Sequence, residues 1–232
     1  MNKKIVIGHL FKEQLNSYED AGNVEVLKTR LLERNIEVEV REYTINENIE
    51  FDQLDLIVIG GGDNRGKRLV VDCLRGWLVE LKEYIESNRP LLVTGSSISL
   101  FGDNVLNQDD EIPGLRILDF VTKQLDDPIE GHVVIEVVLE GRKLALIGYQ
   151  NIKEQYVPNK ELLSMNGEYK QGLLYKHLIG ISLHGPVLAK NKELADLLIK
   201  WACEKKFENF KLVSLSDPLE NKYRKLVIKK NV

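Results

Sequence analysis

Cysteine is scarce in this sequence, and the two cysteines that it has lie far apart. They are Cys73 and Cys203, in a chain of 232 residues. The first apolar run, residues 5–7, is far too short for the hydrophobic part of a secretory signal. Two isolated cysteines without an export signal are typical of a reduced cytosolic protein, so we expect a cytoplasmic location and structural thiols.

Other absences exclude whole classes of function. No apolar run approaches the roughly 18 residues of a membrane-spanning helix, so we expect no membrane partner. A formal net charge of −4 and a pI near 5.7 give no reason to expect a nucleic-acid partner. No Cys/His cluster has metal-ligand spacing and no Gly-x-x-x-x-Gly-Lys-Ser/Thr loop is present, so we expect no metal and no cofactor.

What is present is the composition of an ordinary globular protein, 43% hydrophobic and 29% charged. The length suffices for one large domain with an appendage. We expect a domain over residues 1–206 and an extension over residues 207–232 that packs on it or trails from it. The extension carries a basic run that we expect to be solvated: Lys222, Arg224, Lys225, Lys229 and Lys230.

Strand and helix patterns alternate through the first hundred residues. We expect strands over residues 4–10, 36–41, 54–59 and 91–93. Helical spacing predicts one helix that Asp20 or Asn23 caps and that ends near residue 35, and another over residues 69–88. Because several strands are apolar on both faces, the pattern favours an α/β fold with a mostly parallel sheet flanked by helices.

The second half is less regular. Apolar runs over residues 132–139 and 143–148 flank Glu140-Gly141-Arg142, which predicts a β-hairpin. We also expect a strand beginning at residues 118–121, a polar loop over 149–172, one or two short strands over 173–183 and a helix over 194–203.

The stretch from Pro90 to Gly102 organises the expected site. Its apolar run predicts a buried strand, the four small residues 94–97 turn sharply, and a helix begins near Ile98. This is the geometry of a nucleophile elbow, which exposes one side chain and points helix N–H groups at a ligand. Residues 60–62, all glycine, follow another strand. Since parallel strands end at one edge of a sheet, both turns could face one site, although the glycines also suit a simple tight turn.

Four segments carry a resemblance to a known family. They are residues 15–23 (Leu-Asn-Ser-Tyr-Glu-Asp-Ala-Gly-Asn), 59–63 (Ile-Gly-Gly-Gly-Asp), 90–102 and 179–191, the last with His184-Gly185-Pro186. In this order they resemble the glutaminase subunit of lipid II isoglutaminyl synthase, of the CobB/CobQ (cobyric acid synthase) type of class I glutamine amidotransferases. The resemblance covers nearly the whole chain and implies a flavodoxin-like fold.

The family's chemistry is the hydrolysis of glutamine. A cysteine thiolate attacks the side-chain amide, a histidine moves the proton, and ammonia leaves. The resemblance assigns the proton shuttle to His184. It assigns the backbone groups that bind the oxyanion to Gly61, Gly62 and Ser96. It also implies a partner, a Mur-ligase-like ATP-dependent synthetase subunit, which would use the ammonia to amidate the D-glutamate of the cell-wall stem peptide.

This sequence departs from the family's pattern at the nucleophile. The family's cysteine falls on Gly95, and the two glycines that follow it fall on Ser96 and Ser97. The family's glutamine-binding arginine has no counterpart in residues 126–131, which read Asp-Asp-Pro-Ile-Glu-Gly. Gln171 stands where the family has a glutamate.

Three hypotheses follow from these departures. The loss of thiol, arginine and elbow glycines favours a degenerate subunit without glutaminase activity that partners a Mur-ligase-like enzyme. The second hypothesis is an active amidotransferase with Ser96 or Thr94 as nucleophile, which would need strong activation by His184 because a hydroxyl is far less acidic than a thiol. The third is a non-catalytic sensor that binds an amide or amino acid, glutamine included.

The remaining polar residues are expected to be structural or solvated. Three histidines have no partner in the sequence pattern: His9, His132 and His177. One charged cluster is expected to be a solvated helix start: Asp63, Arg65, Lys67 and Arg68.

Overall fold

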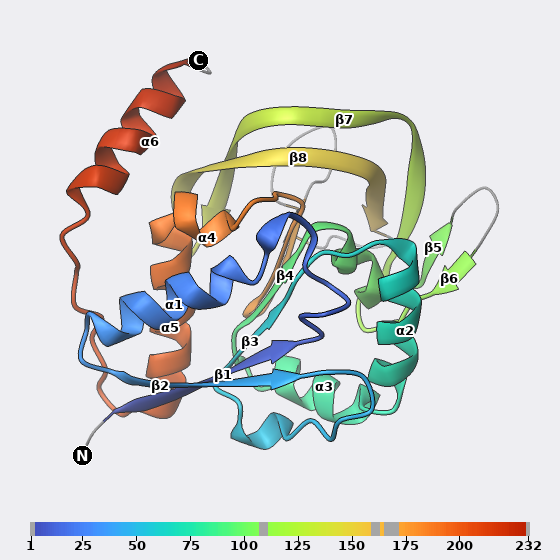
Figure 1. Cartoon of the computed structure of the whole chain (residues 1–232), viewed down its shortest axis with the longest axis horizontal. Coiled ribbons are helices and arrows are strands. Elements are labelled where there is room, and N and C mark those ends of the chain that lie inside the picture. Colours follow the sequence, from blue (N-terminus) through green and yellow to red (C-terminus); the bar gives the residue numbers. More distant parts are fainter. Residues whose placement is uncertain (1–2, 107–110, 159–162, 165–171, 231–232) are drawn as a thin grey trace.

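The computed structural model describes residues 3–106, 111–158, 163–164 and 172–230. Within these residues the central sheet has seven strands, in the order β2-β1-β3-β4-β11-β10-β9 (Figure 1). The strands are β1 (Lys4–Leu10), β2 (Glu37–Tyr43), β3 (Leu56–Ile59), β4 (Leu91–Thr94), β9 (Leu163–Ser164), β10 (Gly172–Tyr175) and β11 (Leu178–Ile181). Neighbours from β2 to β11 pair in parallel, and β10 and β9 add antiparallel pairs. The expected mostly parallel α/β sheet is confirmed.

Helices cover both faces of this sheet. They are α1 (Gly22–Leu32) and α5 (Lys192–Lys206) on one face, and α2 (Asn64–Arg75) and α3 (Leu78–Glu86) on the other. Successive side chains of a strand point to opposite faces. Ile7 of β1 therefore joins the buried cluster that contains Leu27 of α1 and Leu198 of α5, whereas Val6 joins the cluster that contains Leu74 of α2. Covering both faces explains why the central strands read as continuous apolar runs.

The helix expected over residues 69–88 is two helices. α2 ends at Arg75 and α3 begins at Leu78. Gly76 closes α2, and Trp77 has a non-helical backbone with φ −116° and ψ 19°. Glycine is a poor helix former, and its low helix propensity explains the break. The helical spacing of the apolar residues continues on both sides of it. α2 also begins earlier than expected, because the side chain of Asp63 accepts a hydrogen bond from Gly66 N and caps it.

A second sheet has the strand order β6-β5-β7-β8 in the described residues. Its strands are β5 (Asn104–Leu106), β6 (Glu111–Pro113), β7 (Phe120–Leu139) and β8 (Arg142–Pro158). β7 and β8 form the expected hairpin, as a long ribbon that arches over the main sheet (Figure 1). The loop expected over 149–172 is therefore wrong for residues 149–158, which belong to β8. Residues 159–162 and 165–171 lie outside the described residues.

The expected cap of α1 is also wrong. No side chain caps this helix, and Ala21 occupies its N-cap position. Asn23 is fully buried, and its Oδ1 accepts a hydrogen bond from Leu188 N of α4 (Val187–Lys190) instead. The polar side chain at the helix start therefore joins two distant segments of the chain.

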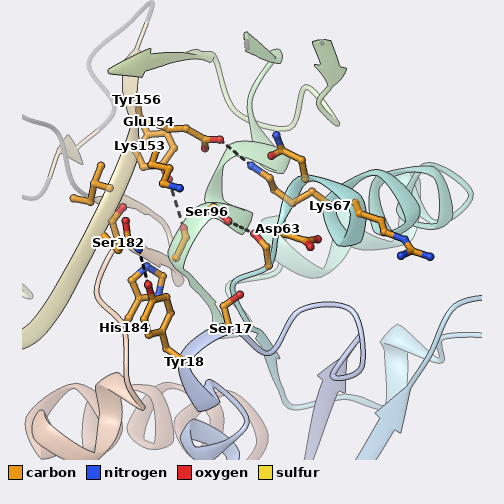
Figure 2. A pocket seen from close by; sticks show the side chains of 16 residues that line it. Ser17, Tyr18, Asp63, Lys67, Ser96, Lys153, Glu154, Tyr156, Ser182 and His184 are labelled. Atoms are coloured by element: carbon orange, nitrogen blue, oxygen red, sulfur yellow. Dashed lines mark hydrogen bonds and ion pairs between the residues drawn. The ribbon is translucent and has the colours of Figure 1, made fainter. Parts of the chain in front are cut away.

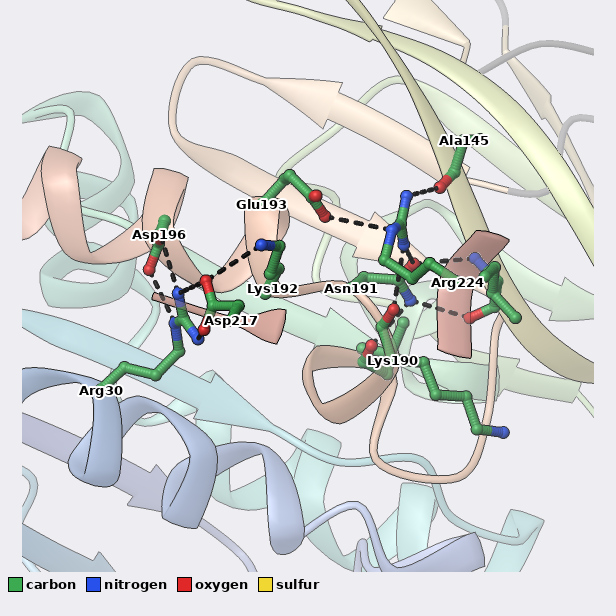
Figure 3. Close-up of polar contacts among 11 residues, drawn as sticks. Arg30, Ala145, Lys190, Asn191, Lys192, Glu193, Asp196, Asp217 and Arg224 are labelled. Carbon is green, nitrogen blue, oxygen red and sulfur yellow. Dashed lines mark hydrogen bonds and ion pairs between the residues drawn. The ribbon is translucent and has the colours of Figure 1, made fainter. Parts of the chain in front are cut away.

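Polar contacts hold the segment from residue 207 onward against the domain. It contains α6 (Pro218–Lys230), which begins just after Asp217. Arg30 of α1 binds Asp196 of α5 at 2.7 Å in a partly buried ion pair and Asp217 at 2.9 Å in a buried one (Figure 3). Arg224 of α6 donates to Ala145 O at 2.7 Å. The expectation of a purely solvated basic run is wrong for Arg224.

Two further properties bear on function. In the ranges that the structure describes, none of the helices is both long and apolar enough to traverse a bilayer. Over the same ranges, His, Cys, Asp and Glu side chains form no group of three or more that could hold a metal ion.

Candidate active site

The glycine loop and the elbow meet at the carboxyl edge of the main sheet. Residues 60–62 follow β3 and Gly95 follows β4, and these two strands are parallel neighbours. A Cβ atom built on Gly61 would lie 3.4 Å from the Cα atom of Gly95. The two turns that the sequence placed at one edge therefore touch each other. A side chain on Gly61 would fill the space between them.

Asp20 ties these two turns together. Its Oδ2 accepts hydrogen bonds from Gly61 N at 2.7 Å and from Thr94 Oγ1 at 2.8 Å. The side chain is fully buried, and this burial raises the pKa of the carboxyl group to about 6, against the two hydrogen bonds, which lower it. The expectation that Asp20 caps a helix is wrong, because its carboxylate binds Gly61 and Thr94 instead.

Gly95 begins the 3-10 helix Gly95–Phe101, which takes the place of the helix expected after the elbow. Its φ is +58°, in the left-handed region that side chains rarely adopt. A Cβ atom built there would lie 2.7 Å from Cε1 of His184. The residue at the tip of this elbow thus points directly at the histidine but has no side chain.

His184 lies just beyond β11 and is 6% exposed. Its backbone N donates to Tyr149 O of β8 at 2.8 Å. The ring of Tyr18 covers it at a centroid distance of 4.4 Å. Burial lowers the pKa of the imidazole, partly offset by a backbone hydrogen bond with Asn151. Nδ1 has no hydrogen-bond partner within the described residues, and the lowered pKa favours the neutral imidazole.

The hydroxyl groups of the elbow are engaged elsewhere. Ser96 Oγ donates to Gly62 O at 2.5 Å, and Thr94 Oγ1 donates to the carboxylate of Asp20. A serine nucleophile needs a base that receives its proton. Both hydroxyl protons point to other acceptors rather than to His184.

A cavity of about 510 Å³ opens beside the elbow and His184 (Figure 2). Its lining comes from five segments: Ser17 and Tyr18, residues 62–65 with Lys67, Gly95 and Ser96, residues 151–154 with Tyr156, and Ser182 with His184. The three predicted residues Gly62, Ser96 and His184 share this lining, together with Gly95. His9, His132 and His177 do not contribute to it.

A buried ion pair forms another wall of this cavity. Lys67 of α2 is fully buried, and its Nζ lies 2.9 Å from Glu154 Oε1 of β8 and 3.5 Å from Ser99 Oγ. The expectation that Lys67 is solvated is therefore wrong. Sequence reasoning missed Glu154 because its segment looked like a loop. The signal that would find the pair is the inward position of Glu154 between Ile152 and Tyr156, which are both buried.

The residues that differ from the family's pattern can be located in the structure. Residues 126–131, where the family's arginine is absent, lie in β7 at a register shift between Gln124 and Ile129. Gln171 lies outside the described residues. Of the two cysteines, Cys203 is buried in α5, and Cys73 lies in α2 outside the lining of the cavity.

A flavodoxin-like sheet that brings a glycine loop and an elbow against a histidine defines the class I glutamine amidotransferase-like fold. Residues 6–192 match the CobB/CobQ-like glutamine amidotransferase domain, and the chain belongs to that family. It is 32% identical to "Lipid II isoglutaminyl synthase (glutamine-hydrolyzing) subunit GatD" of Staphylococcus aureus, over 97% of this chain and 95% of that protein. The Streptococcus pneumoniae protein of the same name is 24% identical, over 87% and 81% of the two chains.

A solved structure supports the fold alone. The glutaminase domain of Trypanosoma brucei CTPS with bound acivicin superposes with a TM-score of 0.54 at 10% identity, over 90% of this chain and 98% of that one.

Proposed function

We propose that this chain is a glutamine amidotransferase-like subunit without glutaminase activity, which partners a Mur-ligase-like enzyme in the amidation of a cell-wall precursor. The family and the names of the two GatD relatives support the subunit role and the cell-wall substrate. The loss of activity is a property of this sequence, and its support lies at the elbow.

The observation that carries the proposal is the geometry of Gly95. A nucleophile elbow places its reactive side chain in a left-handed backbone conformation, within reach of the base. Gly95 has this conformation and its absent Cβ points at His184, but it offers no atom that could attack an amide. A missing nucleophile removes the covalent step, which neither the oxyanion groups nor the histidine can replace.

The contacts of the two hydroxyls argue against a substitute nucleophile. Thr94 is fully buried and bound to Asp20, and Ser96 is bound to the carbonyl of Gly62. Either residue would have to break its hydrogen bond and turn toward His184. Without glutaminase activity, the partner would draw its nitrogen from free ammonia, and this chain would contribute contacts rather than chemistry.

The test is the release of glutamate from labelled glutamine over many hours. The native protein, Gly95→Cys, His184→Ala and the double variant Gly95→Cys/His184→Ala are compared, each with its copurifying ligase where there is one. We expect no turnover by the native protein and a gain in Gly95→Cys that the double variant loses. Native turnover that His184→Ala abolishes would show that a hydroxyl of the elbow is the nucleophile.

The partner is tested by amide formation in the complex. We expect the complex to use ammonium and to ignore glutamine, whereas Gly95→Cys gains some use of glutamine. A complex that uses glutamine in native form contradicts the proposed loss of activity. Failure to copurify with any ligase contradicts the proposed partnership.

The cavity favours a second candidate function, the binding of a small molecule without catalysis. It combines about 510 Å³ of space with the charged pair Lys67–Glu154 and the free Nδ1 of His184. Calorimetric titration with glutamine and glutamate tests this candidate. Saturable binding that Lys67→Met weakens, in a protein that copurifies with no ligase, would favour a sensor.

A further inference from the structure

One side of the helix α6 carries three exposed apolar side chains. Leu219, Tyr223 and Leu226 are 77%, 47% and 54% exposed. Their spacing of four and three residues places them in one stripe along the helix surface. An ordinary surface helix buries such a stripe against its own domain. We call this stripe the outer face of α6.

The inward side of α6 is fixed by polar contacts instead. Arg224 donates to Lys190 O and Asn191 Oδ1 at 3.0 Å each and to Ala145 O at 2.7 Å (Figure 3). The buried ion pair between Arg30 and Asp217 anchors the start of the helix. The helix is therefore held in this orientation at the edge of the molecule (Figure 1), with the three side chains of its outer face exposed.

The charge of α6 is opposite to that of the whole chain. Its sequence has five lysine or arginine residues against one glutamate, in a protein of net charge −4. Lys222 follows Leu219 by three residues and Lys229 follows Leu226 by three, so each lies beside the outer face. Lys222, Lys225 and Lys229 are exposed. Apolar side chains flanked by long cationic ones suit a surface that is both apolar and anionic.

We propose that the outer face of α6 docks on an anionic phospholipid bilayer. By themselves, the three apolar side chains expose far less than the roughly 800 Å² that each partner buries in a standard protein interface. On a bilayer, the attraction of each flanking lysine to anionic headgroups adds to the burial of these side chains. This proposal departs from our expectation of no membrane partner, because a peripheral contact needs no spanning segment. It rests on observations independent of the proposed function.

The test is cosedimentation of the full chain with vesicles. One set is pure phosphatidylcholine and the other an equimolar mixture of phosphatidylcholine and phosphatidylglycerol. The native protein should bind the anionic vesicles alone, and less at high salt. The triple variant Lys222→Gln/Lys225→Gln/Lys229→Gln should lose affinity by at least about tenfold. The pair Leu219→Ser/Leu226→Ser should also lose binding, because it removes the apolar stripe.

A matched control separates this site from diffuse charge. The control triple Lys82→Gln/Lys123→Gln/Lys205→Gln changes the same charge at exposed lysines of other elements and should bind as the native protein does. Thermal unfolding verifies that each variant is folded. The proposal is overturned if the native protein does not bind anionic vesicles or if the control triple weakens binding as much as the α6 triple. It is equally overturned if the α6 variants keep vesicle binding and instead lose copurification with a ligase, since the face would then belong to a protein interface.

Discussion

Two parts of the site at this cavity differ in whether side-chain contacts join neighbouring segments of the chain. In the supporting part, the carboxylate of Asp20 accepts two hydrogen bonds and Lys67 pairs with Glu154. In the reacting part, Gly95 has no side chain and His184 Nδ1 lacks a partner among the described residues. The supporting part holds backbone segments in place, whereas the reacting part would do chemistry. The framework around the elbow is therefore in place although Gly95 carries no side chain.

The supporting part should contribute more to the stability of the fold than the reacting part, and we expect the largest loss of stability when Lys67 is replaced. Lys67→Ala leaves the carboxylate of Glu154 largely buried without its partner, and we expect a loss of about 3–5 kcal/mol in the free energy of unfolding, measured with urea. The double variant Lys67→Met/Glu154→Leu replaces the pair by apolar side chains and should recover most of the loss. Equal losses in the single and double variants would mean that the ion pair itself, and not the cost of leaving the Glu154 carboxylate unpaired, supports the cavity.

The next effect is a pH dependence that Asp20 contributes. Its folded pKa of about 6 lies above the ordinary value of 3.8. Between these values the folded state keeps a proton that the unfolded state has lost, so this contribution to stability is full below about pH 4 and is lost as the pH rises through about 6. The change is on the order of 3 kcal/mol. In Asp20→Asn, the free energy of unfolding should lack this decline.

The difference between native and variant unfolding curves isolates Asp20, because the buried histidines His9 and His184 contribute equally to both. Their lowered pKa values give a slope of the opposite sign, with stability lost as the pH falls through about 6.5. Asp52→Asn, at an exposed carboxylate, is the matched control and should leave the curve unchanged. A difference curve that is flat from pH 4 to 7 would contradict the raised pKa.

Gly95 allows a sharper comparison with a second glycine. Gly95 and Gly141 both have left-handed backbones, with φ +58° and +72°, but a Cβ on Gly141 would meet nothing within 4 Å. Gly141→Ala should cost about 1 kcal/mol through strain alone, and Gly95→Ala about 2 kcal/mol because its methyl group also presses on His184. In a His184→Ala background the two costs should become equal. A persistent excess at Gly95 would place the strain in the contact with Gly61 instead.

The fold was largely predictable, because the central strands are apolar on both faces and therefore stand out as continuous apolar runs in the sequence. The errors lie where polar residues interrupt a pattern. The second part of β8, residues 149–158, looks like a loop in the sequence because its inward positions include Gln150 and Glu154, which break the alternation of Ile152 and Tyr156. The helix break at Gly76 was missed because the apolar spacing continues beyond it.

Only those residues of the candidate site that belong to a sequence motif were predictable. The resemblance supplied the glycine loop, the elbow and His184, and these residues lie together in the structure. Lys67 and Glu154 could not be found in this way, because their proximity is created by the ribbon that arches over the sheet. A lysine at a helix start looks solvated in sequence, and only the fold reveals that β8 covers it.

The smallest stability effect is expected at His184, which tests whether the reacting part supports the fold at all. His184→Ala removes a ring on a cavity wall, so no closed void remains, and the backbone bond from His184 N to Tyr149 O is kept. The loss should be about 1 kcal/mol or less at pH 8, mainly the hydrogen bond of the ring with the backbone at Asn151. Because burial holds the histidine neutral, the native protein loses stability below about pH 6.5 and the variant should then match or exceed it. Thermal unfolding at pH 8 and pH 5.5 provides the measurement. A loss above about 3 kcal/mol at pH 8 would make His184 part of the framework, and the contrast between the two parts of the site would no longer hold.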